Sequence, residues 1–379
     1  MRVISDRSMR ILWLNHRDTT HPRAGGAERT IVELSKRFHD MGNEITLLTS
    51  GYGNFRHEES TDFMSIYRFR GNIRPHLVSS SFLHRDYDVV IDDLAHAVPW
   101  FSEWLGHVPG LVFFRHLHAR SLSGQVPMPM EIAIRLIEKE YHLVYRKWPF
   151  VTESEAGVKD LQGLRIRGDR IYRIPPGVDT TNFRPIPKTP FPSIVFTGRF
   201  MAYKRPDHAI EAMKIVNKSS PEAKLTMIGE GPLLEEMKML AAKNGLGDVI
   251  QFTGKVTDDR MAYLVGSAWV NLHTSTTEGW GYSIMEASAC GVPTVGYRVP
   301  GVAESVQDKM NGSLVQDGNI ESLARGILSV IGEPDRMRVS SREYAEGFSW
   351  RKTAEKWDTL LRFVIHRDGE DRSNGLRPT

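Results

Sequence analysis

The 379-residue chain has a single cysteine, little net charge and no long apolar run. One cysteine, Cys290, excludes an internal disulfide framework and favours a reducing compartment. A formal net charge of +3 disfavours a dedicated nucleic-acid binder, although it leaves a local basic patch open. No segment approaches the roughly 18 apolar residues that a membrane-crossing helix needs. The composition therefore predicts a cytoplasmic globular protein, and the length predicts about two domains.

Apolar runs of strand length alternate with amphipathic helix patterns along the first half. Strands are expected at 10–14, 44–48, 88–91 and 110–114, and helices at 27–41, 131–146 and 154–161. Such an alternation predicts a parallel sheet covered by helices on both faces.

A proline-rich run interrupts this alternation. Residues 183–192 contain four prolines, which continue neither a helix nor a central strand, and the run predicts an interdomain linker. The alternation then restarts, with strands expected at 193–197, 224–228 and 269–273. We therefore predict an α/β protein with two Rossmann-like doubly wound domains, at 1–182 and 193–348. A last amphipathic helix and a polar tail occupy 349–379 and are expected to pack on the first domain.

Two carboxylates with glycines between them mark the most informative loop, Glu278–Glu286. A strand leads into it and a helix leads out, so it lies at the carboxyl end of a strand, where α/β sheets bind ligands. Backbone N–H groups at a helix start face phosphate, and carboxylates accept hydrogen bonds from sugar hydroxyls. The plain alternative is that Ser283 and Glu286 form a capping box that only starts the helix.

Cations and glycines follow two other predicted strands. Arg199 and Lys204 come after the strand 193–197, where together they would neutralise a diphosphate without a metal ion. Gly25 and Gly26 open the first helix, where an anion is favoured. Their spacing lacks the full G-x-G-x-x-G pattern, so a plain tight turn is an equal alternative.

Histidines follow the strand 110–114, at His116 and His118. In an extended backbone their side chains point to opposite sides, so one of them is expected to face the ligand. A third metal ligand at suitable spacing is missing, which disfavours zinc. Asp86 and Asp88 match an acidic D-x-D motif but precede a strand, so they are interpreted as strand-start turn chemistry.

The ordered set of loops resembles the retaining glycosyltransferases of family 4, which have the GT-B fold. The resemblance covers about residues 10–365 and is most specific in the second half. The second-half motifs that carry it are Gly198-Arg199…Lys204, Gly229-Glu-Gly231, Glu278…Glu286, Gly291-Val-Pro293 and Pro300-Gly301…Glu304. The first-half motifs are Gly25-Gly26…Glu28, His116, Thr152-Glu-Ser154 and Pro176-Gly-Val-Asp179.

This resemblance implies a role for each matching position. Arg199 and Lys204 would hold the diphosphate of a nucleotide-sugar donor, and Glu286 would take the ribose hydroxyls. The donor sugar and phosphate would lie against Glu278 and the backbone of Gly279, Trp280, Gly281 and Tyr282. Gly25 and Gly26 would admit the phosphate and acceptor, and His116 would sit by the transferred sugar. No cofactor beyond the donor and no metal are implied.

The implied reaction is hexosyl transfer with retention to a lipid-linked or glycan acceptor. Transfer on one face of the sugar is preferred, because no first-half acid clearly fits a covalent intermediate. Two other classes stay open: a nucleotide-sugar epimerase and a non-catalytic sugar-binding protein. The acceptor is expected at the loop 51–74, which carries Arg56, His57, Arg68 and Arg70. The basic, apolar stretch 128–148 leaves peripheral contact with the inner membrane face open, although a helix covering a sheet is the commoner reading.

Overall fold

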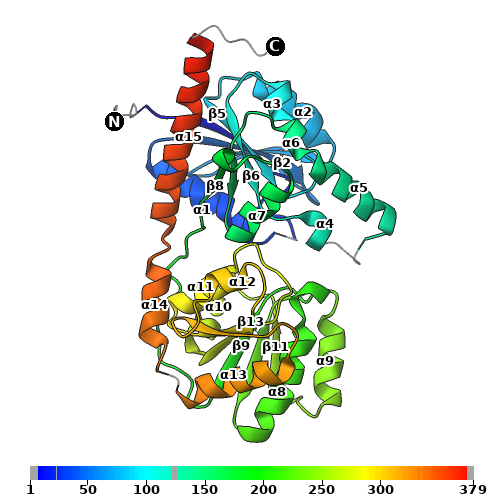
Figure 1. Ribbon diagram of the computed structural model, residues 1–379, viewed down its shortest axis with the longest axis vertical. Helices are drawn as coiled ribbons and strands as arrows, with labels where there is room; N and C mark the ends of the chain where they lie inside the picture. The colour runs from blue at the N-terminus through cyan, green and yellow to red at the C-terminus, as the bar shows by residue number, and fades with distance from the viewer. Residues whose placement is uncertain (1–6, 23, 122–125, 334, 374–379) are drawn as a thin grey trace. The chain divides into compact units, whose positions relative to one another are not determined.

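The computed structural model describes residues 7–22, 24–121, 126–333 and 335–373 (Figure 1). It divides into two compact units: residues 1–176 with 350–379, and residues 177–349. Each unit has a mostly or wholly parallel sheet with helices around it, which confirms the predicted α/β class with two doubly wound domains.

The first unit holds a sheet with the strand order β3-β4-β2-β1-β5-β6-β7-β8 within the described residues. Only the β3–β4 pair is antiparallel among the described strand pairs of this sheet. From β4 to β7 the parallel strands run 3-2-1-4-5-6 in chain order, so the order reverses between β1 and β5. The strand bounds are β1 (Arg10–Leu14), β2 (Glu44–Gly51), β3 (Glu58–Ser60), β4 (Ser65–Arg70), β5 (Val89–Leu94), β6 (Gly110–Phe114), β7 (Phe150–Thr152) and β8 (Ile171–Arg173).

The long C-terminal helix α15 (Trp350–Ser373) packs within the first unit. Trp357 is fully buried there, with its ring 6.0 Å from the ring of Trp13 on β1 and 4.8 Å from that of Phe113 on β6. The other helices of this unit are α1 (Gly26–Asp40), α2 (Arg74–Leu83), α3 (Ser102–Leu105), α4 (His118–Ser121), α5 (Met128–Lys139), α6 (Tyr141–Val144), α7 (Glu155–Gly163) and the 3-10 turn η1 (Gly168–Arg170).

The second unit has a parallel sheet in the order β11-β10-β9-β12-β13-β14 within the described residues. This is again the 3-2-1-4-5-6 order, with its reversal between β9 and β12. The strands are β9 (Ser193–Thr197), β10 (Lys224–Ile228), β11 (Ile250–Gly254), β12 (Val270–His273), β13 (Thr294–Tyr297) and β14 (Gly312–Val315). The helices are η2 (Ala202–Lys204), α8 (Pro206–Ser219), α9 (Leu234–Lys243), α10 (Asp258–Ser267), α11 (Tyr282–Ala289), α12 (Val302–Ser305), α13 (Ile320–Gly332) and α14 (Arg338–Glu346).

The proline-rich run 183–192 belongs to the second unit, although the sequence predicts a linker there. Phe183 is fully buried, and the Thr189 N–H donates to the Ser267 carbonyl at 3.1 Å. The Trp269 indole N–H returns a bond to the Thr189 carbonyl at 2.9 Å. Prolines without N–H donors therefore coexist here with a run that its remaining polar groups and one aromatic ring fix to the unit. The chain passes between the units at residues 176–177 and 349–350.

Candidate functional site

The candidate site of the second unit lies at the reversal point of its sheet. The loop after β9 carries Arg199 and Lys204, and the loop after β12 carries Glu278. Because β9 and β12 are adjacent parallel strands, their carboxyl ends bring these loops together. Ligands of open α/β sheets bind at such a point.

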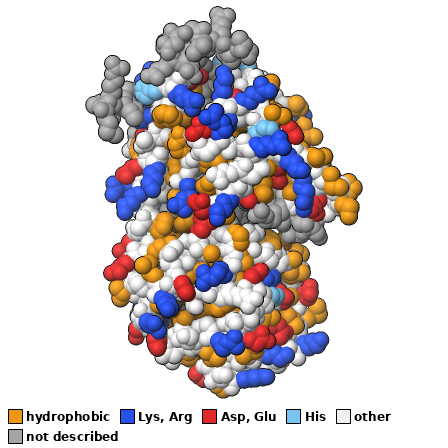
Figure 2. Space-filling view, in the orientation of Figure 1, with side chains coloured by type: hydrophobic (Ala, Val, Ile, Leu, Met, Phe, Trp, Pro, Cys, Tyr) orange, Lys and Arg blue, Asp and Glu red, His pale blue; other side chains and the backbone are white. Residues whose placement is uncertain are grey.

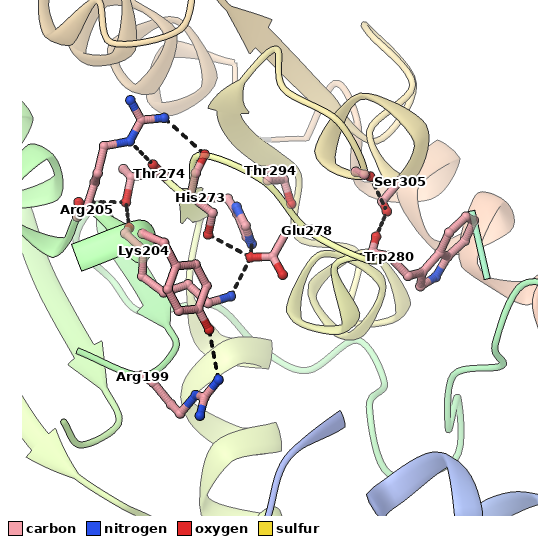
Figure 3. Close-up of polar contacts among 12 residues, drawn as sticks. Arg199, Lys204, Arg205, His273, Thr274, Glu278, Trp280, Thr294 and Ser305 are labelled. Carbon is pink, nitrogen blue, oxygen red and sulfur yellow. Dashed lines mark hydrogen bonds and ion pairs between the residues drawn. The ribbon is translucent and has the colours of Figure 1, made fainter. Parts of the chain in front are cut away.

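Glu278 receives three polar groups on one carboxylate oxygen (Figure 3). Its Oε1 pairs with the Lys204 ammonium, accepts from the Ser275 hydroxyl at 2.7 Å and lies 3.3 Å from Nε2 of His273. The Lys204 and Glu278 side chains are 15% and 14% exposed, so both charges are mostly withdrawn from water yet still reachable. The sequence predicts Lys204 and Glu278 at this site, but not the contributions of His273 and Ser275.

The pairing shifts the pKa of both partners. Burial alone would raise the pKa of Glu278, but the Lys204 charge and the His273 hydrogen bond outweigh it and leave that pKa well below its usual range. Burial would lower the pKa of Lys204, and the Glu278 charge reverses this and raises it. The site therefore holds a fixed cation and a fixed anion across the physiological pH range.

The backbone around Glu278 is held by the turn before α12. The Glu278 N–H donates to the Pro300 carbonyl at 3.1 Å. Gly301 has φ +78°, and a Cβ there would lie 2.1 Å from the Glu278 carbonyl oxygen. The Ser305 hydroxyl donates to the Trp280 carbonyl. These contacts explain why a glycine is needed at 301, since another residue would displace the Glu278 loop.

The helix α11 starts at Tyr282, with Gly281 as its N-cap at φ +86° and no side-chain cap bond. The capping-box interpretation is therefore wrong, because Ser283 already lies inside the helix. Glu286 lies within α11 and is 5% exposed, and Trp280 is buried with its ring 5.4 Å from that of Phe348.

Arg199 is exposed at the start of the β9 loop and donates to the Tyr203 hydroxyl at 2.9 Å. The glycines Gly229 and Gly231 support this loop from β10, because a Cβ at either would collide with the backbone of Gly198 or Phe200. The structure thus gives the predicted Gly-x-Gly motif a packing role beneath the cation-bearing loop.

In the first unit, the two glycines Gly25 and Gly26 start α1 with Gly25 as N-cap. The Gly25 N–H donates to the Glu28 carboxylate at 2.7 Å. This contact is the reciprocal half of a capping box, so the motif has a structural role in its own right.

The two histidines after β6 differ sharply in exposure. His118 starts α4, is buried, and has Nδ1 3.5 Å from the Glu138 carboxylate, whereas His116 is exposed. Their ring centroids are 4.7 Å apart, so the expectation of an extended backbone with opposite-facing side chains is wrong. Of the two, His116 is the side chain that an external ligand reaches.

A histidine cluster that the sequence did not single out lies at the reversal point of the first sheet. His16 follows β1, His96 follows β5, and His76 lies on α2. The Nε2 atoms of His16 and His76 are 2.8 Å apart, and the His16 and His96 rings are 4.3 Å apart. Burial, followed by the charge of Arg17, lowers the pKa of His96 to about 3, and burial also lowers the pKa of His16 and His76. The rule that ligands meet loops after strands would have found His16 and His96.

The acids that follow first-sheet strands are each held by a neighbour. Asp92 accepts from the Ser102 hydroxyl at 2.6 Å and the Tyr145 hydroxyl at 2.9 Å, and burial raises its pKa to about 7. Arg115 pairs with Asp93 at 2.7 Å and with Glu153 at 3.0 Å. The second of two adjacent aspartates thus lies in a buried ion-pair network.

Two other polar groups have structural roles. Asp86 pairs with Arg10 at 2.7 Å, and Asp88 accepts from the Arg10 N–H at 2.7 Å, which confirms strand-start chemistry for this D-x-D match. Arg68, expected near the acceptor, is instead 3% exposed on β4 and pairs with Asp18 and Glu59. A buried arginine between two carboxylates is committed to the fold.

Metal-binding clusters and membrane-crossing helices are both absent from the described residues. Those residues contain no group of three histidine, cysteine or carboxylate side chains arranged to hold a metal ion. No helix in the described part of the chain has the length and apolar character to cross a bilayer.

Comparison with known proteins places both units in one family. The model for glycosyl transferases group 1 matches residues 179–348, and the model for Glycosyltransferase Family 4 matches residues 24–182. A GDP-mannose-dependent alpha-(1-6)-phosphatidylinositol monomannoside mannosyltransferase of Mycobacterium tuberculosis is 30% identical over 205 residues. That alignment spans 49% of this chain and 52% of the relative, so the match covers about half the length of such relatives.

Two broader similarities extend over nearly the whole chain. A phosphatidylinositol N-acetylglucosaminyltransferase from Arabidopsis thaliana is 24% identical, in an alignment that spans 93% of this chain and 81% of the relative. The sucrose-phosphate synthase structure from Thermosynechococcus elongatus superimposes with a TM-score of 0.76 at 19% identity, covering 95% of this chain and all of the other. The two family models, the relatives and the shared two-unit α/β fold show that the chain belongs to glycosyltransferase family 4, with the GT-B fold.

Proposed function

We propose that the protein is a retaining, metal-independent glycosyltransferase that moves a hexose from a nucleotide-diphosphate sugar to a lipid-linked or glycan acceptor. The observation that carries this proposal is the Lys204–Glu278 pair at the reversal point of the second sheet. The pair presents a cation and a carboxylate side by side, which suits a ligand that has both phosphate and sugar hydroxyls.

The donor diphosphate is assigned to Lys204 and Arg199. An ammonium has three N–H donors, so Lys204 keeps Glu278 on one and offers the others to phosphate oxygens. Arg199 is exposed and makes its bond to Tyr203 through a single nitrogen, which leaves other guanidinium N–H groups for phosphate. As the glycosidic bond breaks, charge builds on the departing phosphate, and fixed cations there lower the barrier.

The sugar is assigned to Glu278 and the backbone of Gly279–Tyr282, and the ribose to Glu286. Glu278 uses Oε1 for its contacts with Lys204, Ser275 and His273, and its second carboxylate oxygen, Oε2, takes part in none of these three. A carboxylate oxygen accepts from sugar hydroxyls. In this proposal Gly25, Gly26 and His116 serve the acceptor side and the transferred sugar.

Retention on one face of the sugar is supported by the state of the first-unit acids. A covalent intermediate needs a carboxylate at the anomeric carbon. Asp92 is fully buried and hydrogen-bonded, Asp93 and Glu153 are paired with Arg115, and Asp18 is paired with Arg68. Each of these acids would have to leave its partner to act as a nucleophile, so transfer assisted by the leaving phosphate is the simpler route.

A lipid-linked acceptor and contact with the inner membrane face are supported by two observations. Both sequence relatives named above carry phosphatidylinositol in their names. The helix α5 exposes a row of large apolar side chains beside basic ones, and Figure 2 shows hydrophobic atoms gathered where α5 lies in Figure 1. Such a surface binds anionic lipid. The apolar members are Met128, Met130, Ile132, Leu136 and, on α6, Leu143, and the basic neighbours are Arg135, Lys139, Arg146 and Lys147.

The test is release of nucleoside diphosphate from UDP-, GDP- and ADP-sugars, with and without phosphatidylinositol or glycan acceptors. A transferase releases the diphosphate in proportion to added acceptor, and the product keeps the anomeric configuration of the donor. Isomerised sugar nucleotide formed without acceptor would instead identify an epimerase. Binding without turnover for any donor would favour a sugar-binding protein.

The matched variants for this test are Lys204→Met and Lys238→Met. Lys204→Met removes the cation at the site, and we expect a loss in kcat/KM of at least about 100-fold, because a charge-assisted contact to the leaving group contributes about 2.7 kcal/mol or more. Lys238 is an exposed lysine of α9 that pairs with Glu235, and its variant should keep wild-type activity. Equal activity of the two variants would remove Lys204 from the mechanism.

A further inference from the structure

The residue after Lys204 has an unusual backbone conformation. Arg205 lies at φ +45°, in the left-handed region that favours glycine, between η2 and α8. Such a conformation is unfavourable for a residue with a Cβ and persists only when other contacts hold it. The contacts that hold Arg205 therefore show what the strained position achieves.

The guanidinium of Arg205 is bound on three sides (Figure 3). Its Nε donates to the Thr274 carbonyl at 2.8 Å, and its Nη2 donates to the Ser275 carbonyl at 3.1 Å. The same Nη2 lies 2.5 Å from the Asp317 carboxylate, and the guanidinium stacks 4.6 Å from the Tyr297 ring centre. The side chain is 15% exposed, so these contacts are largely shielded from water.

The main chain of Arg205 is tied to the same loop in return. The Thr274 hydroxyl lies 2.6 Å from the Lys204 carbonyl and 2.8 Å from the Arg205 carbonyl. The Thr276 N–H donates to the Tyr203 carbonyl at 2.8 Å. The loop after β9 and the loop after β12 are thus joined in both directions at this one residue.

Both ends of the Lys204–Glu278 pair depend on these two loops. Lys204 directly precedes Arg205, so the carbonyl that Thr274 holds is its own. Ser275, whose carbonyl Arg205 binds, places its hydroxyl on Glu278 at 2.7 Å. A displacement of the Arg205 guanidinium is therefore transmitted to both charged partners through single residues.

We propose that Arg205 is a positioning residue that holds Lys204 on Glu278 and so preorganises the diphosphate-binding pair. It acts through Lys204 and Ser275 and is not assigned a contact with the donor. This inference rests on the proposed function for its effect on catalysis, but its effect on the Lys204–Glu278 pair stands without it. Sites held in productive geometry by neighbouring bonds lose activity when the neighbours are removed.

The decisive variant is Arg205→Gly, because glycine adopts φ +45° without strain and the change removes only the side chain. We expect the dissociation constants of UDP or GDP, whichever the wild type binds, to rise at least about 10-fold, with kcat lowered for the cognate donor. The melting temperature should stay near that of the wild type, because relief of backbone strain offsets part of the lost bonding. Asp317→Asn is the matched control: it leaves the two carbonyl bonds in place, and we expect less than a twofold change.

A second measurement needs no donor at all. Trace acylation of the full chain, read by mass spectrometry, compares Lys204 with the exposed Lys238 as internal reference. Paired with Glu278, Lys204 should react slowly in the wild type and at least fivefold faster in Arg205→Gly. Free guanidinium at millimolar concentration should slow it again by occupying the vacated position, whereas ammonium at equal ionic strength should not. A role in fold stability alone would not produce this rescue.

The outcomes separate the two ideas. If Lys204 reactivity in Arg205→Gly stays within twofold of the wild type, or guanidinium has no effect, Arg205 is not a positioning residue. If reactivity rises and is rescued but the wild type binds no nucleotide sugar, the positioning role stands and the proposed function fails.

Discussion

Replacement of Gly301 by alanine should displace the loop that carries Glu278. Gly301 has φ +78°, and an added Cβ would lie 2.1 Å from the Glu278 carbonyl oxygen and 3.0 Å from the Glu278 Cβ. Ordinary van der Waals contact begins at 3.4 Å, so the two segments must separate by more than 1 Å. The flexible end of a side chain does not absorb this shift, because the nearest atom belongs to the backbone.

The expected cost has two parts. A left-handed backbone costs a residue with a Cβ about 1–2 kcal/mol, and forcing packed segments apart costs about 1–3 kcal/mol. Gly301→Ala should therefore lower the free energy of unfolding by about 2–5 kcal/mol. Gly245, at φ +71° with no atom within 4 Å of the added Cβ, is the matched control in the same unit. Gly245→Ala should lose only the conformational part, about 1–2 kcal/mol.

The assay combines urea unfolding with titration calorimetry of UDP and GDP. Because the displaced loop carries Glu278, nucleotide affinity should fall more than about 10-fold in Gly301→Ala and stay unchanged in Gly245→Ala. Equal stability losses in the two variants would show that the Glu278 backbone does not restrict residue 301. Wild-type affinity in Gly301→Ala would show that the position of Glu278 is irrelevant to binding.

Three further predictions concern the first unit. The pKa of Asp92 is raised to about 7, so its contribution to stability is present below the unfolded value near 4 and is lost as pH rises through 7. Unfolding free energy should thus fall by about 3 kcal/mol more in the wild type than in Asp92→Asn between about pH 5 and pH 8, and parallel pH profiles would refute this. Trp357→Ala should cost about 3–5 kcal/mol in urea unfolding and the exposed Trp104→Ala about 1 kcal/mol or less, and equal costs would contradict the packing of α15. The double variant Ile132→Glu with Leu136→Glu should abolish co-flotation with anionic vesicles without affecting the binding of soluble nucleotide, and unchanged flotation on phosphatidylinositol-containing vesicles would exclude α5 as the contact surface.

Much of this architecture was predictable from the sequence, because buried parallel strands are short apolar runs and ligand groups follow them. That reasoning placed Lys204 and Glu278 in one half of the molecule, on loops at strand ends. It also identified the Asp86 motif as strand-start chemistry, which the Arg10 contacts confirm.

The rest depends on backbone angles and partners that a linear pattern does not encode. A positive φ at Gly281 makes it the N-cap of α11, so Ser283 falls inside the helix. The left-handed Arg205 and the approach of His273 to Glu278 arise from tertiary contacts. Arg68 looked available to an acceptor because its strand was not recognised, and the carboxylates that bury it are distant in sequence or lie on the neighbouring strand.

The binding of a nucleotide-sugar donor at Lys204 and Glu278 is tested most directly by thermal shift of the full chain. Wild type and Lys204→Met would be screened against UDP-, GDP- and ADP-sugars at high concentration. At about 100 times its dissociation constant, a donor should stabilise the wild type by about 2.7 kcal/mol, and the variant should show a much smaller shift. No shift of the wild type with any donor, or an equal shift of the variant, would contradict the assignment of this pair as the donor site.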